Sequence, residues 1–325
     1  MLEHKQIRTL MKSIFIPIVL TAILALAACQ SSTTTDGNQL STPTSGQITI
    51  AVDETLKPVI DAQLSVFAHD YPKADITPKF VPEGEAINML LNDSVQLAIV
   101  CRELTDKEKA FLKTRDYKAI QTKSAKDGIA LIVNPANTDT LLKYDKMMSI
   151  LKGEITDWKQ LNPKSKAGKI QLVFDQALSS TYRYITESTG VLNLETKNFY
   201  AVGNDEKVIE YVSKNKEAIG FIGSSWISDK NDSTALSFIQ SVNVLGISPK
   251  PGADGQNEYF QPFQAYIAQD AYPFTRTIYA VCSEPRAGLA TGFSSFMAGP
   301  KGQRIFLKSS VVPAKMPIRL IRVTK

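Results

Sequence analysis

The chain has 325 residues, of which 43% are hydrophobic and 21% are charged, and its formal net charge is +5. This ordinary composition argues against a disordered chain and against any membrane span beyond the N-terminal apolar run. The weak positive charge comes without an arginine-rich run or an interleaved basic and aromatic patch, so we do not expect nucleic-acid binding. Small anions stay open as ligands.

The first 28 residues have the pattern of a secretory signal peptide. Basic residues precede an apolar run over residues 13–28, which is shorter than the ~20 residues that a membrane-spanning helix needs. The run ends in Leu26-Ala27-Ala28, directly before Cys29. This pattern is typical of bacterial lipoproteins, in which cleavage leaves the cysteine as the lipid-bearing first residue; a plain cleaved signal or a hairpin helix is the alternative. We expect removal of residues 1–28 and an exported chain anchored through acyl groups, such as palmitate, on Cys29 at the extracytoplasmic side of a membrane.

The segment after Cys29 has the composition of a linker. Residues 31–46 are mostly small and polar and include no aromatic residue, as in flexible segments. We therefore predict a disordered tether over residues 29–46 and a folded part that begins near Gln47. The roughly 280 residues that follow suffice for two lobes. Removing the signal, with its three basic residues and one acid, lowers the formal charge from +5 to +3.

The folded part begins with alternating strands and helices. Apolar runs predict strands over residues 48–52, 76–81 and 95–101. Helical periodicity predicts a helix that begins at Thr55 and stops before Pro72, and another over residues 85–91. Thr105 and Glu108 have the spacing of a capping box at the start of a further helix.

The same alternation continues to the C-terminus and indicates an α/β fold. Residues 128–133 form a continuous apolar run, typical of a strand buried on both faces, which we interpret as the first crossover between lobes. Further strands are predicted over residues 169–174, 218–223, 279–282 and 318–323. Helices are predicted over residues 141–151, from Thr181, over 205–213 and over 292–307.

Few residues of the mature chain have the chemistry of catalysis or metal binding. Cys101 and Cys282 are the remaining cysteines, too few for a thiolate metal cluster, and their pairing stays open. His69 is the only remaining histidine, and no Ser/His/Asp arrangement surrounds it. We expect no cofactor and no enzymatic activity.

Four predicted strand-to-helix junctions share a property that suits anion binding. Each places unpaired backbone N–H groups at the positive end of a helix, where an anion gains ~0.3–1 kcal/mol. The junctions are residues 53–55, 83–85, 101–103 and 178–181.

Several segments, in order, resemble the phosphate-binding lipoproteins of ABC import systems. They are GEITDW with LNP (residues 153–158 and 161–163), SST (179–181), EAIGF (217–221), YPFTR with IY (272–276 and 278–279) and GPKGQ (299–303). The resemblance implies a two-lobed type II periplasmic-binding-protein fold with crossover strands near residues 128–133 and 275–282. Lobe I would comprise residues 47–130 and 275–325, and lobe II residues 131–274. It also implies a monomer that captures phosphate or a similar oxyanion between its lobes and delivers it to an ABC permease and ATPase.

The resemblance places an anion-binding threonine at Thr55 in the first loop, and Gly84 and Glu85 in the second, where the acidic residue departs from the family. The third loop places Arg102 as a planar donor. The fourth loop of the family reads Ser-Gly-Thr after an arginine. Here it reads Ser179-Ser180-Thr181, and the arginine is absent.

Two features leave the ligand open. Arg183 compensates for the missing arginine only if its side chain points back toward the start of its helix. Acids also gather at the same junctions, where Asp53 or Asp175 is suited to accept the proton of monohydrogen phosphate, a proton that sulfate lacks. The alternative is an anchored protein that binds another oxyanion, or that keeps the fold without a ligand and acts as an adaptor.

Overall fold

The computed structural model describes residues 41–190, 198–227, 240–255 and 257–316. The predicted signal peptide, Cys29, most of the predicted tether and the predicted strand over residues 318–323 lie outside the described residues. Within these ranges, none of the helices has the length and apolar character needed to cross a bilayer.

A mixed sheet runs through the described chain, with the strand order β2-β1-β3-β11-β4-β8-β6-β7. Its strands are β1 (Gly46–Asp53), β2 (Ala74–Val81), β3 (Leu97–Val100), β4 (Ile120–Val133), β6 (Gln171–Phe174), β7 (Phe199–Ala201), β8 (Ala218–Gly223) and β11 (Thr275–Cys282). The short strands β9 (Asn243–Val244) and β12 (Val312–Pro313) pair with β4, and β5 (Leu141–Leu142) pairs with β10 (Gly246–Ile247).

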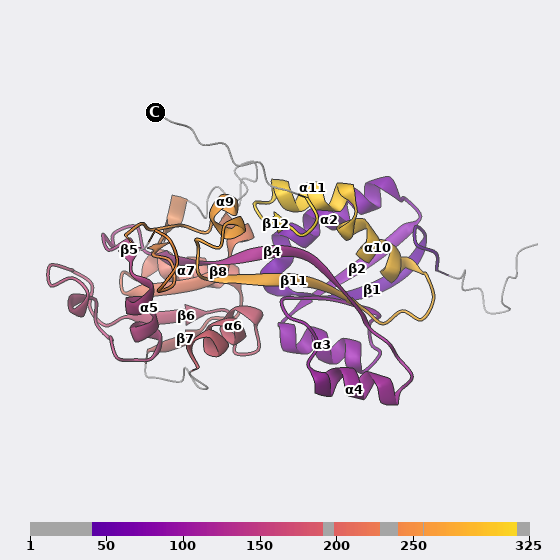
Figure 1. The fold of residues 1–325 in the computed structure, drawn as a ribbon, viewed down its shortest axis with the longest axis horizontal. Helices are drawn as coiled ribbons and strands as arrows, with labels where there is room; N and C mark the ends of the chain where they lie inside the picture. The colour runs from indigo at the N-terminus through magenta and orange to yellow at the C-terminus, as the bar shows by residue number, and fades with distance from the viewer. Residues whose placement is uncertain (1–40, 191–197, 228–239, 256, 317–325) are drawn as a thin grey trace, which may run out of the picture. The chain divides into compact units, whose positions relative to one another are not determined.

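The strands β4 and β11 join two lobes. In each lobe the neighbouring strands are parallel, β2-β1-β3 in lobe I and β8-β6-β7 in lobe II. Strand β4 pairs antiparallel with β11 up to Gly128 and with β8 from Ile129 onward. Figure 1 shows β4 and β11 lying side by side as they pass between the lobes. This confirms the predicted two-lobed α/β fold with crossover strands, while the predicted lobe boundaries stay a proposal.

Lobe I has helices on both faces of its sheet because its strands alternate apolar residues between two cores. Ile50 and Val52 of β1 pack with α2 (Lys57–Asp70), α10 (Leu289–Ala298) and α11 (Pro300–Lys308). Ala51, on the opposite face of β1, packs with α3 (Glu83–Leu91) and α4 (Asp106–Thr114). The predicted capping box of Thr105 and Glu108 is present at the start of α4.

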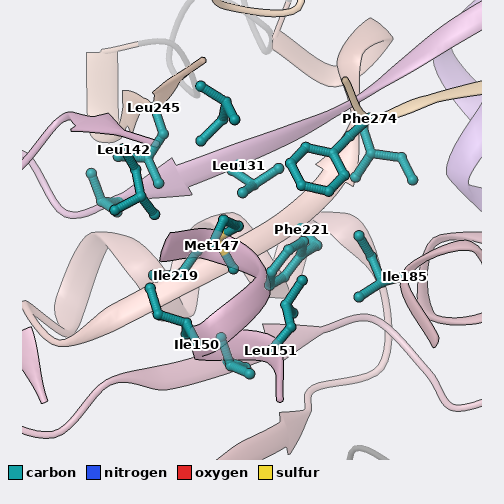
Figure 2. Close-up of a cluster of buried hydrophobic side chains, with 14 of the residues drawn as sticks. Leu131, Leu142, Met147, Ile150, Leu151, Ile185, Ile219, Phe221, Leu245 and Phe274 are labelled. Carbon is teal, nitrogen blue, oxygen red and sulfur yellow. The ribbon is translucent and has the colours of Figure 1, made fainter. Parts of the chain in front are cut away.

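Lobe II repeats this layered arrangement. Figure 2 shows Leu131, Met147, Phe221 and Phe274 in one core, which β4 and β8 share with α5 (Tyr144–Leu151) and α6 (Ser180–Thr189). Alternate residues of the same strands, such as Ile132, pack on α7 (Asp205–Lys214) on the other face. The short helix α9 (Gln264–Ala268) and the 3₁₀ turns η1 (Glu54–Leu56), η2 (Trp158–Gln160) and η3 (Ser224–Ile227) complete the described elements.

Three sequence predictions differ from the structure. The single helix predicted over residues 292–307 is two helices, because Gly299 is extended (φ −86°, ψ 172°) and the following Pro300 has no N–H to continue the hydrogen-bond ladder. The helix predicted from residue 141 begins at Tyr144, because Leu141 and Leu142 pair with β10. The strand predicted from the apolar run at residue 279 begins earlier, at Thr275, which confirms the second crossover strand that the resemblance implies over residues 275–282.

The predicted tether is wrong in its last six residues. Thr42 and Ser45 form a short bridge, and Gly46 already belongs to β1. The Oγ of Ser41 accepts a hydrogen bond of 3.0 Å from the backbone N–H of Leu289 at the start of α10. Residues 41–46 are therefore structured, although the sequence predicts a folded part only from near Gln47.

Candidate functional site

Arg276 of β11 is the central cation of a buried polar network between the lobes. The residue is only 3% exposed, and both Nε and Nη2 donate to Asp127 Oδ2 on β4, at 3.2 and 3.0 Å. Its Nη1 donates to the hydroxyls of Ser180 (2.6 Å) and Thr181 (3.0 Å) at the start of α6. The neighbouring acids raise the pKa of Arg276 against the effect of burial, so the guanidinium stays charged.

Thr55 brings the first loop of lobe I to the same place. Its Oγ1 lies 3.2 Å from Ser180 Oγ, and its backbone carbonyl accepts a hydrogen bond of 3.0 Å from the indole of Trp226 in lobe II. Local sequence sets this geometry, since Asp53 caps the turn by accepting from the Thr55 N–H at 3.2 Å. The structure thus brings together three of the predicted site residues, Thr55, Ser180 and Thr181, around Arg276.

The remaining predicted residue of the fourth loop has a supporting position. Ser179 is the N-cap of α6, where its Oγ accepts from the Tyr182 N–H at 3.1 Å. The same hydroxyl donates to Asp175 Oδ1 at 2.6 Å. Because its O–H donates to Asp175, Ser179 holds the start of α6 in place. The hydroxyls of Ser180 and Thr181 contact the guanidinium of Arg276.

Three buried carboxyl groups border this network. Asp53, Asp175 and Asp205 are at most 1% exposed. Burial raises the pKa of Asp175 to about 7, and it raises the pKa values of Asp53 and Asp205 as well. The half-buried Glu54 has a pKa of about 7, also through burial. Near neutral pH this part of the site therefore carries less negative charge than its sequence implies.

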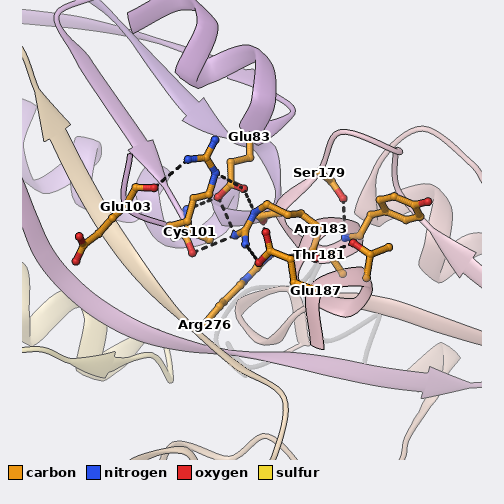
Figure 3. Close-up of polar contacts among 12 residues, drawn as sticks. Glu83, Cys101, Glu103, Ser179, Thr181, Arg183, Glu187 and Arg276 are labelled. Atoms are coloured by element: carbon orange, nitrogen blue, oxygen red, sulfur yellow. Dashed lines mark hydrogen bonds and ion pairs between the residues drawn. The ribbon is translucent and has the colours of Figure 1, made fainter. Parts of the chain in front are cut away.

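Figure 3 shows a second guanidinium, that of Arg183, reaching across to lobe I. Its Nε contacts Glu83 Oε2 in an ion pair, and its Nη2 donates to the backbone carbonyl of Cys101 at 3.2 Å. Glu83 Oε1 in turn accepts from the Cys101 N–H at 2.7 Å. The donors of Arg183 are therefore taken up by Glu83 and the Cys101 carbonyl of lobe I and, through Nη1 at 2.7 Å, by Glu187 of α6 itself.

Arg102 does not join Thr55 and Thr181. Its Nη1 and Nη2 bind the two carboxylate oxygens of Glu108 at 2.8 and 2.7 Å, and Nη1 also donates to the Glu103 carbonyl at 2.9 Å. This bidentate pair holds Arg102 against the start of α4. The predicted role of Arg102 as an anion donor therefore lacks support from its contacts.

The second predicted loop contributes backbone rather than side chains. The Gly84 N–H donates to the Leu178 carbonyl of lobe II at 3.2 Å. Glu85 is exposed, and its charge helps to raise the pKa of Glu54. Gly84 therefore lies at the lobe contact, whereas Glu85 lies at the rim.

Asp53, Glu83 and Cys101 hold their ligand atoms within 4.8 Å of one another, which is close enough for a shared metal ion. The residues fit a metal poorly. Both oxygens of Glu83 are already bound, by the Cys101 N–H and by Arg183, and burial raises the pKa of Cys101, which favours the thiol over the thiolate that a metal needs. Cys101 and Cys282 are both free and buried, which settles their open pairing against a disulfide.

Three charged residues of the site were not predicted from the sequence: Arg276, Asp127 and Asp205. A signal was present for the first two. Arg276 alternates with the buried Ile278 and Ala280 along β11, and Asp127 directly precedes the apolar run of β4. A charge on the apolar face of a strand indicates a buried partner, and Arg276 and Asp127 are register partners in the sheet.

Two parallel-stranded lobes, antiparallel crossover strands and polar loops that meet between the lobes define a protein of the two-lobed binding-protein class. Residues 37–301 match the family described as the PBP superfamily domain. The chain belongs to this superfamily.

Individual relatives agree with this assignment. The chain is 24% identical over 280 residues to the phosphate-binding protein PstS of Staphylococcus saprophyticus, with 85% of this chain and 81% of the relative covered. It is 25% identical over 256 residues to PstS of Staphylococcus aureus strain USA300, with 78% and 76% covered.

Solved structures share the fold. A putative phosphate ABC transporter substrate-binding protein with bound phosphate from Clostridium perfringens superposes with a TM-score of 0.69 at 22% identity, covering 83% of this chain and 100% of that one. An ABC-type phosphate transport receptor from Vibrio cholerae has a TM-score of 0.61 at 21% identity, with coverages of 82% and 100%.

Proposed function

We propose that the protein is a solute-binding protein that holds inorganic phosphate, or a similar oxyanion, between its two lobes. The observation that carries the proposal is the buried Arg276 guanidinium in contact with the hydroxyls of Ser180 and Thr181. The relatives named above are phosphate-binding proteins, which favours phosphate among the oxyanions.

The hydrogen-bond directions suit an anion. A guanidinium only donates, so the oxygens of Ser180 and Thr181 act as acceptors toward Arg276 and keep their own protons to donate. Thr55 adds a third hydroxyl from the opposite lobe. The start of α6 adds the positive end of a helix. We infer that an oxyanion takes the place of the direct Thr55–Ser180 contact and is held by donors from both lobes.

The role of each predicted residue follows from its contacts. We assign Thr55, Ser180 and Thr181 to ligand binding, with Ser179 as the cap that positions the last two. Gly84 and Arg183 are assigned to the contact between the lobes, which forms around the bound anion. Arg102 and Glu85 have no ligand contact in this proposal.

We further propose that Cys29 carries lipid and that the protein works outside the cytoplasm as a monomer with an ABC permease and ATPase. The support is the signal pattern of the sequence and the transport names of the relatives with this fold. Labelling of cells with radioactive palmitate tests the anchor. The label should appear on the wild-type protein and be absent from Cys29→Ala.

Titration calorimetry with phosphate, sulfate, molybdate and an organic phosphate tests the ligand. Phosphate should bind with measurable heat, and a protein that binds sulfate in preference to phosphate would contradict the assignment. An adaptor without a ligand is the second candidate, favoured by the direct contacts Gly84–Leu178 and Arg183–Glu83 between the lobes. The adaptor predicts no heat with any of the four anions.

A further inference from the structure

The buried acids of the cleft outnumber the cations that face them. Two of the acids have partners: Asp127 pairs with Arg276, and Glu83 pairs with Arg183. Three others remain. Among the residues that the structure describes, no salt bridge joins a cation to Asp53, Asp175 or Asp205.

These three acids share one hydrogen-bonding pattern. In each, Oδ1 accepts a hydrogen bond from the protein: from the Thr55 N–H to Asp53, from the Ser179 hydroxyl to Asp175, and from the Gly223 N–H to Asp205. In each, Oδ2 is buried and has no hydrogen-bond partner within the described part of the chain. A buried polar oxygen without a partner costs ~1–3 kcal/mol, and more if it is charged, so three of them in one network point to a missing ligand.

The three acids come from different elements and act on one another. Asp53 ends β1, Asp175 follows β6 and Asp205 begins α7, and the charges of Asp53 and Asp175 both raise the pKa of Asp205. The same surroundings hold other charged or titratable groups. They are Glu54 of η1, Glu83 of α3, Cys101 after β3, Asp127 of β4, Arg183 of α6, Arg276 of β11, and the exposed Glu206 and Lys207 of α7.

Full ionisation would place the three carboxylates and a bound anion in one buried space beside a single fully buried guanidinium. Like charges at short range in a dry site repel strongly. A protonated carboxyl group instead has an O–H that donates to an anion, as a buried neutral aspartic acid does in an oxyanion hole. Protonation therefore removes the repulsion between the three unpartnered oxygens and the anion. It also makes these oxygens hydrogen-bond donors.

We propose that Asp53, Asp175 and Asp205 serve the cleft as neutral carboxylic acids whose O–H groups donate to the bound oxyanion, so that the anion binds together with protons. The inference rests on the proposed oxyanion binding. It reverses the expectation from the sequence, in which Asp53 or Asp175 accepts a proton from monohydrogen phosphate. The site then selects an oxyanion for its ability to accept hydrogen bonds. The affinity of the site for the anion falls as the pH rises.

Substitution by asparagine separates donor from acceptor. The asparagine amide has nearly the shape of a carboxylic acid and always offers an N–H donor. In Asp175→Asn, the donor model predicts that phosphate affinity is kept within about threefold near pH 6 and becomes less dependent on pH. Asp175→Ala, which removes the donor, should weaken binding by about tenfold or more.

The test is calorimetry with inorganic phosphate near pH 6 and near pH 8, each in two buffers of different ionisation heat, so that the protons taken up are counted. The wild-type affinity should fall by about tenfold or more between the two pH values. Phosphate titrates in this range itself, and Asp175→Asn is the control because it leaves that titration unchanged. The wild type should therefore take up more protons than Asp175→Asn.

The outcomes are distinguishable. Equal proton uptake in the wild type and Asp175→Asn, or loss of binding in Asp175→Asn to the level of Asp175→Ala, contradicts this inference and leaves the proposed function standing. A wild-type protein that binds no phosphate at either pH contradicts both this inference and the proposed function. A wild-type protein that binds Mg²⁺ or Zn²⁺ in this network without an anion also contradicts both. Circular dichroism of each variant verifies that it is folded.

Discussion

Arg276, near the start of β11, and Asp127 of β4 join the two crossover strands, with both Nε and Nη2 of the guanidinium within 3.2 Å of Asp127 Oδ2. The two residues are register partners in the antiparallel pair of β11 and β4. Asp127 therefore fixes the direction in which Arg276 presents its remaining Nη1 to Ser180 and Thr181. The pair links the strands that connect the lobes to the donors of the cleft.

Removal of Asp127 should destabilise the protein strongly. Asp127→Ala leaves the Arg276 guanidinium buried without its carboxylate, which typically costs about 3–5 kcal/mol in the free energy of unfolding. Urea unfolding followed by circular dichroism measures the change. The control is Glu210→Ala, which breaks the exposed pair with Lys214 and should leave the midpoint unchanged. Similar midpoints for the two variants would contradict the central role of the pair.

The hydroxyl of Thr181 should contribute directly to phosphate affinity. Thr181→Val keeps the shape of the side chain and removes the O–H, so the dissociation constant should rise by about tenfold to a hundredfold, corresponding to ~1–3 kcal/mol. Thr114→Val, at the exposed end of α4, is the matched control and should bind as the wild type does. Calorimetry compares the three proteins, and equal affinities would remove Thr181 from the site.

Arg102 should matter little for the ligand. Because Glu108 binds both Nη atoms of Arg102, Arg102→Ala should keep phosphate affinity within about twofold, since charges held by an ion pair outside the site add little. Glu108→Ala should behave in the same way. If Arg102→Ala instead loses affinity as Thr181→Val does, the role that the sequence predicted for Arg102 would be restored.

Stability should fall as the pH rises from about 4 to about 7. Burial raises the pKa of Asp175 from its ordinary value of 3.8 to about 7. Between these values the folded protein holds a proton that the unfolded chain has released. The stabilisation is thus complete below the unfolded pKa and is lost as the pH rises through the folded pKa.

The size of this effect should be on the order of 4 kcal/mol for Asp175 over the whole of this pH range, and the raised pKa values of Asp53 and Asp205 act in the same direction. Asp175→Asn stays neutral at every pH and should lose less stability between pH 5 and pH 8 than the wild type. Urea unfolding of both proteins at the two pH values measures this loss of stability. A wild type that is more stable at the higher pH would contradict the buried, protonated acids.

Gly220 should not tolerate a side chain. A Cβ at this position of β8 would lie 2.7–2.9 Å from Val212, Val208 and Ile132, so Gly220→Ala overpacks the core and should cost about 1–3 kcal/mol. At Gly168 the nearest atom to an added Cβ is 4.0 Å away, and Gly168→Ala should be tolerated. A shift in the unfolding midpoint for Gly220→Ala alone is the expected result.

The order of strands and helices was largely predictable from the sequence because it follows local signals. The apolar period of residues 128–133 reflects burial on both faces of β4, and the hydroxyls of the fourth loop mark the start of α6. Pro300 indicated the break between α10 and α11, because proline interrupts the hydrogen bonds of a helix. The helical spacing of apolar residues continues across the break and favours a single helix.

The partners of the charged residues were not predictable in the same way. Arg276 meets Asp127 only through the register of two strands about 150 residues apart in sequence. Arg102 and Arg183 both belong to loops or helix starts that the sequence predicts at the binding site. Only the structure shows that Glu108 binds Arg102 and that Glu83 binds Arg183. Long-range register therefore decides which partners take up the donors of each guanidinium.

A crystal structure of the protein grown with phosphate tests the central claim most directly. The account predicts a phosphate between the lobes, with its oxygens within about 3 Å of the hydroxyls of Thr55, Ser180 and Thr181 and close to Arg276. Phosphate bound elsewhere, or an unchanged Thr55–Ser180 contact with no anion beside it, would contradict the account.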